Sequence, residues 1–146
     1  LPIVRRLSSD GIPVNITAVM TPNQVRGIAG TLDPETPAIV SVFAGRIADT
    51  GRDPVPVMQD CVEILKARPK AHLLWASPRE LLNIFHADAA GCHIITVTGD
   101  LLAKLSLVGK DLNDFSLDTV RMFYDDAVRA GYEIGDSGTN RLRAVG

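Results

Sequence analysis

The chain of 146 residues has the length of one ordinary domain, with 46% hydrophobic and 22% charged residues, as in a packed globular protein. Its net charge of −2 gives no bulk attraction to nucleic acid or to a membrane surface, and we expect neither as a partner. No apolar run approaches the roughly 20 residues of a spanning helix. The two cysteines, Cys61 and Cys92, show neither CxxC nor metal-ligand spacing, so we expect reduced, partly buried thiols in a cytoplasmic protein.

The first third of the chain shows a strand, a helix and a second strand. A run rich in β-branched residues predicts a strand at Ile12–Met20. Thr21 and Pro22 then indicate a helix start, because threonine caps a helix and proline favours its first position. The nearly continuous apolar run Ala38–Phe43 predicts the second strand.

The middle of the chain repeats this alternation. A helix that Pro69 stops is indicated by apolar residues at helical spacing, namely Val57, Cys61, Ile64 and Leu65. The segment AHLLWAS, residues 71–77, predicts a third strand. Ser77 and Pro78 repeat the signal of a cap followed by proline, so the next helix is predicted to begin there, and Gly91 ends it.

The last third begins with a predicted fourth strand, His93–Thr98, and a short helix at 100–107. A long amphipathic helix follows, with Ser116 as its predicted cap and Ile134 as its end. Its apolar residues on one face are Leu117, Val120, Phe123, Tyr124 and Val128. The remainder, 135–146, is a polar, glycine-rich tail.

Alternating strands and helices predict an α/β fold with parallel strands and crossover helices. Four such units make either a small open sheet or half of an eight-stranded barrel. Polar residues on the strands and just after them favour the barrel, because a barrel brings the carboxyl ends of its strands together around one site. These residues are Asn15, Thr17, Ser41, Ser77, Thr96 and Thr98.

Four segments resemble one known family. VNITAV, SVFAGRI, WASPRE and AGCHIITVTGDLLAKL, in this order, resemble the transaldolase and fructose-6-phosphate aldolase family. The resemblance implies a (β/α)8 TIM barrel of the class I aldolase type, of which this chain covers strands 5–8 and the C-terminal helix. On this interpretation residues 1–134 are the C-terminal half of the barrel and 135–146 form the tail.

The resemblance also implies a lysine Schiff base on the fourth strand, which lies before Leu1. The lysines present are Lys66, Lys70, Lys104 and Lys110, all on predicted helices or loops. A Schiff-base lysine must lose its proton, which requires desolvation or a nearby cation, so none of the four is assigned as the nucleophile. The family chemistry needs no metal or organic cofactor. Because none of its own lysines is assigned as the nucleophile, we expect the chain to be a fragment of a longer protein, or a half-barrel without this chemistry.

The resemblance makes Arg46 and Ser41 ligands of a substrate phosphate. A guanidinium offers a planar fork of donors that matches phosphate oxygens, and the serine adds a hydroxyl. The sequence alone also allows a surface arginine paired with Asp49 or Asp53.

Arg79 and Ser77 form a second predicted part of the phosphate site. An arginine in the first turn of a helix is unusual, because the positive end of the dipole disfavours cations, and it indicates an anionic partner. The alternative is an ion pair between Arg79 and Glu80 or Glu35.

Asn15 and Thr17 are the predicted catalytic residues. They are two apart and therefore on the same side of a strand, where Asn15 could bond a substrate hydroxyl and Thr17 could hold a proton-relaying water. Phe43, at the same spacing from Ser41, is expected to line the substrate site. The alternatives are an ordinary strand threonine and a core phenylalanine.

We expect transaldolase-like aldol transfer or cleavage of a ketose phosphate. The alternatives are a phosphosugar-binding half-barrel or pseudoenzyme without Schiff-base chemistry, and a phosphosugar isomerase or epimerase. The expected partners are a sugar phosphate and, because a half-barrel leaves two strand edges unpaired, either further copies of the chain or the missing half-barrel.

Overall fold

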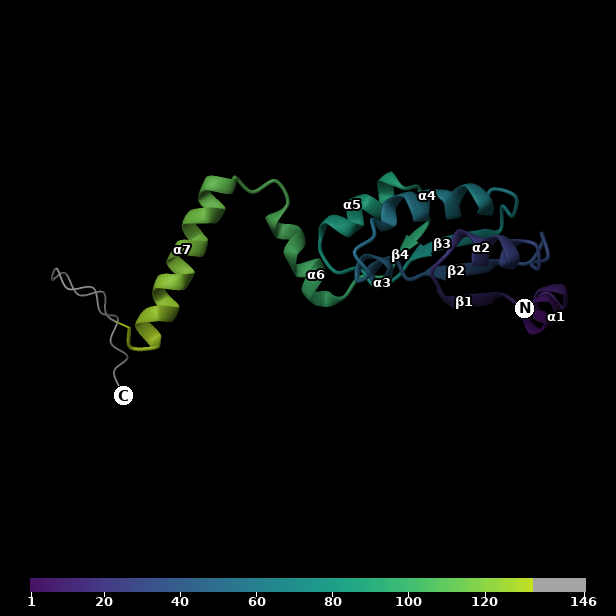
Figure 1. Cartoon of the computed structure of the whole chain (residues 1–146), viewed down its shortest axis with the longest axis horizontal. Coiled ribbons are helices and arrows are strands. Elements are labelled where there is room, and N and C mark those ends of the chain that lie inside the picture. Colours follow the sequence, from purple (N-terminus) through teal and green to yellow (C-terminus); the bar gives the residue numbers. More distant parts are fainter. Residues whose placement is uncertain (133–146) are drawn as a thin grey trace. The chain divides into compact units, whose positions relative to one another are not determined.

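A computed structural model describes residues 1–132 of the chain, and it divides into a unit Leu1–Leu105 and a second unit that begins at Ser106. The predicted tail, 135–146, and the predicted helix end at Ile134 lie outside the described residues. The elements in chain order are α1 (Pro2–Ser9), β1 (Val14–Val19), α2 (Pro22–Ala29), β2 (Ala38–Val42), α3 (Ala44–Ala48), α4 (Pro54–Leu65), β3 (Ala71–Trp75), α5 (Leu82–Ala89), β4 (Ile94–Ile95), α6 (Gly99–Ala103), a 3₁₀ turn (Lys104–Leu107) and α7 (Leu112–Arg129) (Figure 1).

The four strands form one parallel sheet in the order β1-β2-β3-β4. Each strand therefore lies beside the next one in the sequence, with at least one helix in each connection. The predicted α/β fold with parallel strands is confirmed. Within the sheet Asn15 pairs with Ile39, which pairs with His72, so these three residues share one face.

The core lies between the other face of the sheet and the helices α2, α4 and α5 (Figure 1). The strands contribute Val19, Ala38, Val40, Val42, Ala71, Leu73 and Trp75, and the helices contribute Val25, Ile28, Met58, Cys61, Leu65 and Ala87. The face that carries Asn15 is different, because Asn15, Thr17 and His72 are all exposed. The sheet is thus covered by helices on one face and bears polar, accessible side chains on the other.

Two helices begin with a capping side chain followed by proline, and the first of them was predicted at Thr21 and Pro22. Thr21 accepts a hydrogen bond from the backbone N–H of Gln24, whose side chain in turn accepts from the Thr21 N–H, a complete capping box ahead of Pro22. Asp53 caps α4 by accepting from the N–H of Val55 at 2.9 Å.

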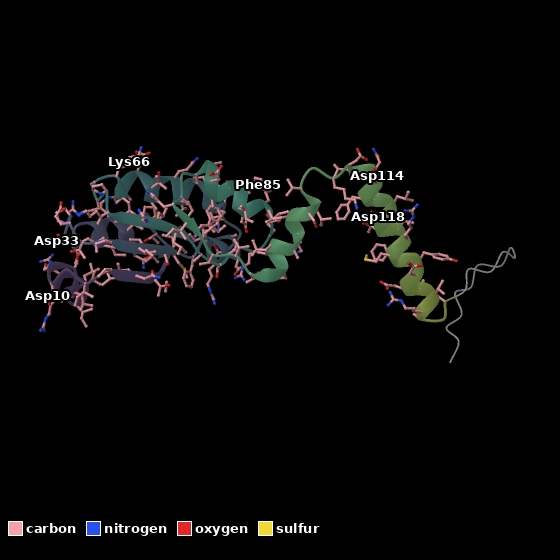
Figure 2. The ribbon with its side chains drawn as sticks, turned by 180° about the vertical axis from the view of Figure 1, so that it is seen from behind. Asp10, Asp33, Lys66, Phe85, Asp114 and Asp118 are labelled. Carbon is pink, nitrogen blue, oxygen red and sulfur yellow. The ribbon has the colours of Figure 1, made fainter. Side chains whose placement is uncertain are left out.

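Other boundaries differ from the prediction. The helix expected at Ser77–Pro78 begins only at Leu82, and the fourth strand is paired over Ile94–Ile95 alone. The cap of α7 is Asp111 rather than Ser116, because its carboxylate accepts two backbone N–H groups at the head of the helix. Asp114 and Asp118, labelled in Figure 2, lie on this helix.

The helix α1 is fastened to the connection between α2 and β2 through Ser8, which is fully buried. Its hydroxyl accepts from the N–H of Asp33 at 2.8 Å, and its carbonyl accepts from the hydroxyl of Thr36 at 2.8 Å. Asp33 and Asp10, the residue after α1, lie at the same end of the unit (Figure 2). Buried polar groups that are fully paired in this way fix the position of α1.

Both cysteines are free thiols, as predicted, with Cys61 buried and Cys92 half-buried. Burial raises the pKa of the Cys61 thiol to about 12 and that of Cys92 to about 11. Both are therefore protonated, weak nucleophiles at neutral pH. Within residues 1–132, none of the helices is both long and apolar enough to cross a membrane.

His93 holds the start of β4 against β3, and this contact should make stability pH-dependent. The Nδ1 of its ring accepts the backbone N–H of Leu73 at 3.1 Å, and its backbone N–H donates to the carbonyl of Leu73. Its ring stacks on that of His72, with the ring centroids 4.9 Å apart. Desolvation, with a smaller contribution from His72, lowers the pKa of His93 below the ordinary 6.5. An imidazolium has no acceptor at Nδ1, so protonation must break the bond to Leu73.

The unfolded chain takes up this proton at a higher pH than the folded chain. The contribution of His93 is therefore unchanged above pH 6.5 and is lost as the pH falls from there towards the folded-state pKa. Urea unfolding at pH 7.5 and 5.5 measures the loss. His93→Asn keeps an acceptor near the Nδ1 position but cannot titrate, so it should lose less stability between these two pH values. Equal losses in both proteins would contradict the assignment.

Candidate functional site

The predicted site residues lie on β1 and β2 and in the segments that follow β2 and β3. Between Ile16 and Val19 the register with β2 shifts, so Thr17 and Ala18 together stand opposite one residue of β2. Ala18 has a φ of 62°, a left-handed conformation that costs a non-glycine residue of order 1 kcal/mol or more. Bulges of this kind re-aim side chains beside active sites.

Asn15 and Ser41 are brought together by the parallel register of β1 and β2. The Ser41 hydroxyl donates to Asn15 Oδ1 at 2.8 Å, and Ser41 is 4% exposed. This bond leaves the amide N–H groups of the exposed Asn15 side chain free to donate to a ligand. Thr17 is exposed at the bulge, and its hydroxyl forms no hydrogen bond to another residue in the described part of the chain.

Arg46 does not end a strand, as the sequence had indicated. It lies on α3, a five-residue helix that the sequence analysis missed and that begins two residues after β2. Its side chain is exposed and forms no hydrogen bond or ion pair with any residue in 1–132. The pairing with Asp49 or Asp53 is not observed, because Asp49 bonds Arg79 and Asp53 caps α4.

The connection after β3 lies directly on the first turn of α3. The Gly45 N–H donates to the carbonyl of Ala76 at 3.3 Å, and a Cβ on Gly45 would stand 1.6 Å from the carbonyl oxygen of Ser77. Ser77 has a φ of 59°. The close approach thus depends on a glycine in α3 and on a left-handed serine in the connection.

Arg79 lies in this connection and not in a helix, because α5 begins three residues later. The idea of an arginine in a first helical turn is therefore wrong. Its N–H donates to Asn83 Oδ1 at 2.7 Å, and its guanidinium bonds the carboxylate of Asp49. Neither Glu80 nor Glu35 is its partner, since Glu35 pairs with Lys70.

Phe43 stands between the two groups of residues. It is half-buried, precedes α3, and its N–H donates to the carbonyl of Val19 at 2.8 Å. The structure therefore brings Asn15 to Ser41, and Arg79 to α3. No hydrogen bond joins these two groups within the described residues. The roles of Asp49 and Gly45 were not found from the sequence, because their partners Arg79 and Ala76 lie about 30 positions away. The role of Asn83 was missed because it accepts backbone N–H groups of residues that the sequence had placed in a helix.

None of the four lysines lies within a strand of the described sheet. Lys66 pairs with Glu63, Lys70 with Glu35 and Lys110 with Asp118, while Lys104 is exposed at the end of α6. In residues 1–132 no three His, Cys, Asp or Glu side chains are grouped as a metal site would require.

Comparisons with known proteins give the same family as the resemblance of the four sequence segments. The family model for transaldolase/fructose-6-phosphate aldolase matches residues 1–142. The chain belongs to this family. The resemblance predicted from the four segments is thereby confirmed.

Individual relatives bear similar names. The chain is 36% identical over 103 residues, 69% of this chain and 45% of the relative, to a "Probable transaldolase" of Nitrosopumilus maritimus. It is 34% identical over 132 residues, 88% of this chain and 56% of the relative, to a "Probable transaldolase" of Desulforudis audaxviator. The chain thus spans about half the length of the curated transaldolase relatives it matches. The four-stranded parallel sheet of the chain is consistent with a family of the TIM-barrel type.

Proposed function

We propose that this chain supplies the residues that bind the substrate phosphate, here called the phosphate grip, and part of the proton relay of a transaldolase-like enzyme. The enzyme transfers or cleaves an aldol unit of a ketose phosphate through a lysine Schiff base. The observation that carries the proposal is the exposed Arg46 guanidinium, which no residue in 1–132 pairs although Asp49 is one turn away. A guanidinium without an internal partner at the carboxyl edge of a parallel sheet is suited to a substrate anion.

The roles of the remaining residues follow from their places. Arg79 and Ser77 add donors for the phosphate, and Phe43 lines the substrate. The single hydroxyl proton of Ser41 is donated to Asn15, so Ser41 is assigned to the orientation of Asn15 and not to the phosphate. Asn15 donates its amide to a substrate hydroxyl, supported by its bond from Ser41. The exposed Thr17 holds the water that relays protons during imine formation and bond cleavage. No metal or organic cofactor takes part in this scheme.

The proposal treats the chain as strands 5–8 of a (β/α)8 barrel. A doubly wound sheet reverses its strand order and carries helices on both faces. Here the order is consecutive, and the core helices cover one face only. The accessible face with Asn15, Thr17 and His72 corresponds to a barrel interior, which a second half-barrel fills.

The nucleophilic lysine is placed on a strand before Leu1, because none of the four lysines of this chain lies within a strand and three of them form ion pairs. The same observation favours a second candidate, a phosphosugar-binding half-barrel without Schiff-base chemistry. The two candidates share the phosphate grip and differ only in covalent chemistry.

The proposal also includes association with another polypeptide chain and a location in the cell. The helix α7 exposes Leu117 (49%), Val120 (60%), Phe123 (64%) and Tyr124 (65%). Apolar side chains this accessible on one helix support association with further copies or with the missing half-barrel. The free thiols support a cytoplasmic location.

Reductive trapping tests the proposal. A ketose phosphate and borohydride are added to the 146-residue chain and, separately, to a product of the same gene that includes the residues encoded before Leu1. Intact mass should show a reduced sugar adduct on the longer protein and none on the chain. An adduct on one of the four lysines here would refute the upstream position. Phosphate binding without any adduct on the longer protein would establish the binding module instead.

A further inference from the structure

Arg79 is held at its two ends by two side chains from different elements. Its backbone N–H donates to Asn83 on α5, and its Nη2 donates to Asp49 Oδ2 at the end of α3. Between these points its Nε lies over Gly45, 3.2 Å from where a Cβ would stand. The path of the side chain is therefore defined from the backbone to the guanidinium.

The backbone end is fixed from inside the protein. Asn83 is only 8% exposed, and its Oδ1 also accepts the N–H of Glu80 at 3.2 Å. One buried amide oxygen thus binds two successive N–H groups of the connection after β3. This arrangement leaves only the long side chain of Arg79 free to move.

Asp49 restrains that side chain. Its own side chain is 51% exposed and that of Arg79 is 49% exposed. An ion pair this accessible contributes little to stability. Its main consequence is therefore orientation, because a guanidinium in one place loses less rotational freedom when it binds a ligand.

Asp49 bonds only one of two arginines that could be its partner. It lies three residues after Arg46 on α3, a spacing that puts both on one side of the helix, yet it bonds Arg79 from the neighbouring connection. No side chain in residues 1–132 pairs with Arg46, which is therefore available to a ligand, while the pair with Asp49 leaves Arg79 with further N–H donors.

We propose that Asp49 is a positioning residue that fixes the guanidinium of Arg79 beside α3, so that Arg79 and Arg46 bind the same phosphate. This inference rests on the proposed function, because it assumes that the arginines meet a phosphate. It adds a residue whose charge is the same as that of the ligand. Simple electrostatics gives the opposite expectation, since removing a negative charge near an anion site should tighten anion binding.

The test compares three variants of the full 146-residue chain in a titration with inorganic phosphate followed by NMR. Asp49→Ala removes the acceptor and should weaken phosphate binding about tenfold, although the chain has become more positive. Asp49→Asn keeps an acceptor oxygen and should bind within about twofold of the unaltered chain. Asp53→Asn, a matched control, makes the same charge change near α3 and keeps the cap of α4, so it should have no effect.

A second readout does not involve phosphate. The Nε–Hε signal of Arg79 should show restricted motion in the unaltered chain and in Asp49→Asn, and fast motion in Asp49→Ala. Equal motion in all three, or tighter phosphate binding by Asp49→Ala, would overturn the inference.

Failure of the proposed function can be distinguished from failure of the role of Asp49. If phosphate does not bind the unaltered chain, or if Arg46→Ala binds it equally well, the phosphate site itself is refuted and the role of Asp49 with it. If Arg46→Ala weakens binding and Asp49→Ala does not, only the role of Asp49 is refuted.

Discussion

Arg46→Ala should weaken binding of a phosphorylated ketose by about 30- to 1000-fold, which corresponds to about 2–4 kcal/mol for a lost charge-assisted hydrogen-bonded pair. The unphosphorylated ketose should bind as before. The fold should not change, because Arg46 is exposed and bonds no residue in the described part of the chain. The free energy of unfolding should therefore stay within about 0.5 kcal/mol, as for other surface substitutions. Titration calorimetry with both ligands measures the difference.

Two further substitutions separate geometry from charge. Arg46→Lys keeps the charge but loses the planar fork, so its loss of affinity should be intermediate. Arg52→Ala removes an exposed arginine from the segment between α3 and α4 and should leave affinity unchanged. Equal losses for Arg46→Ala with the phosphorylated and unphosphorylated ketose would refute the phosphate role. Equal effects of Arg46→Ala and Arg52→Ala would point to net charge alone.

The strands and two of the helix starts could be predicted because their signals are local. Runs of β-branched residues mark the first two strands and the short apolar run AHLLW marks the third, and Thr21 and Asp53 precede prolines at real helix starts. Ser77–Pro78 carries the same local signal but does not start a helix. There the chain is held in a left-handed turn against Gly45, and Asn83 binds its N–H groups from inside. Tertiary contacts override the local preference.

The helix α3 was missed for a related reason. Its five residues are too few to show a periodicity, and it is stabilised by non-local contacts such as the hydrogen bond from Gly45 to Ala76. The fourth strand was overestimated because its apolar run continues past the point where pairing with β3 stops. The apolar pattern of a segment indicates that it is buried, whereas its pairing as a strand also depends on the neighbouring strand.

The candidate site was predictable where its residues share a strand. The spacing of Asn15 and Thr17 indicates one face, but the bond from Ser41 to Asn15 also requires the register of two strands. The partnership of Arg79 with Asp49 joins residues 30 apart and has no local signal. For that reason the sequence identified the arginines through the family motif and missed the residue that orients one of them.

Gly45→Ala should destabilise the protein by about 3 kcal/mol or more, a large effect for one methyl group. The new Cβ would stand 1.6 Å from the carbonyl oxygen and 2.7 Å from the carbonyl carbon of Ser77. Both are backbone atoms, so the methyl group cannot be accommodated by a side-chain rotation. The connection after β3 must move, which breaks the hydrogen bond from Gly45 to Ala76 and shifts Arg79 away from α3. Urea unfolding measures the stability, and a phosphate titration of the folded variant should show weaker binding.

Gly27→Ala is the matched control, because Gly27 is also a helical glycine with an ordinary negative φ. Its new Cβ meets only the end of the Leu1 side chain, at 3.5 Å, which is normal van der Waals contact. Alanine restricts the unfolded chain more than glycine does, so Gly27→Ala should stabilise the protein by about 0.4–1 kcal/mol. The backbone preference is the same at both positions, so the opposite signs isolate the contact with Ser77 as the cause. If Gly45→Ala is as stable as Gly27→Ala, α3 tolerates a side chain at Gly45 and the connection does not depend on this close approach.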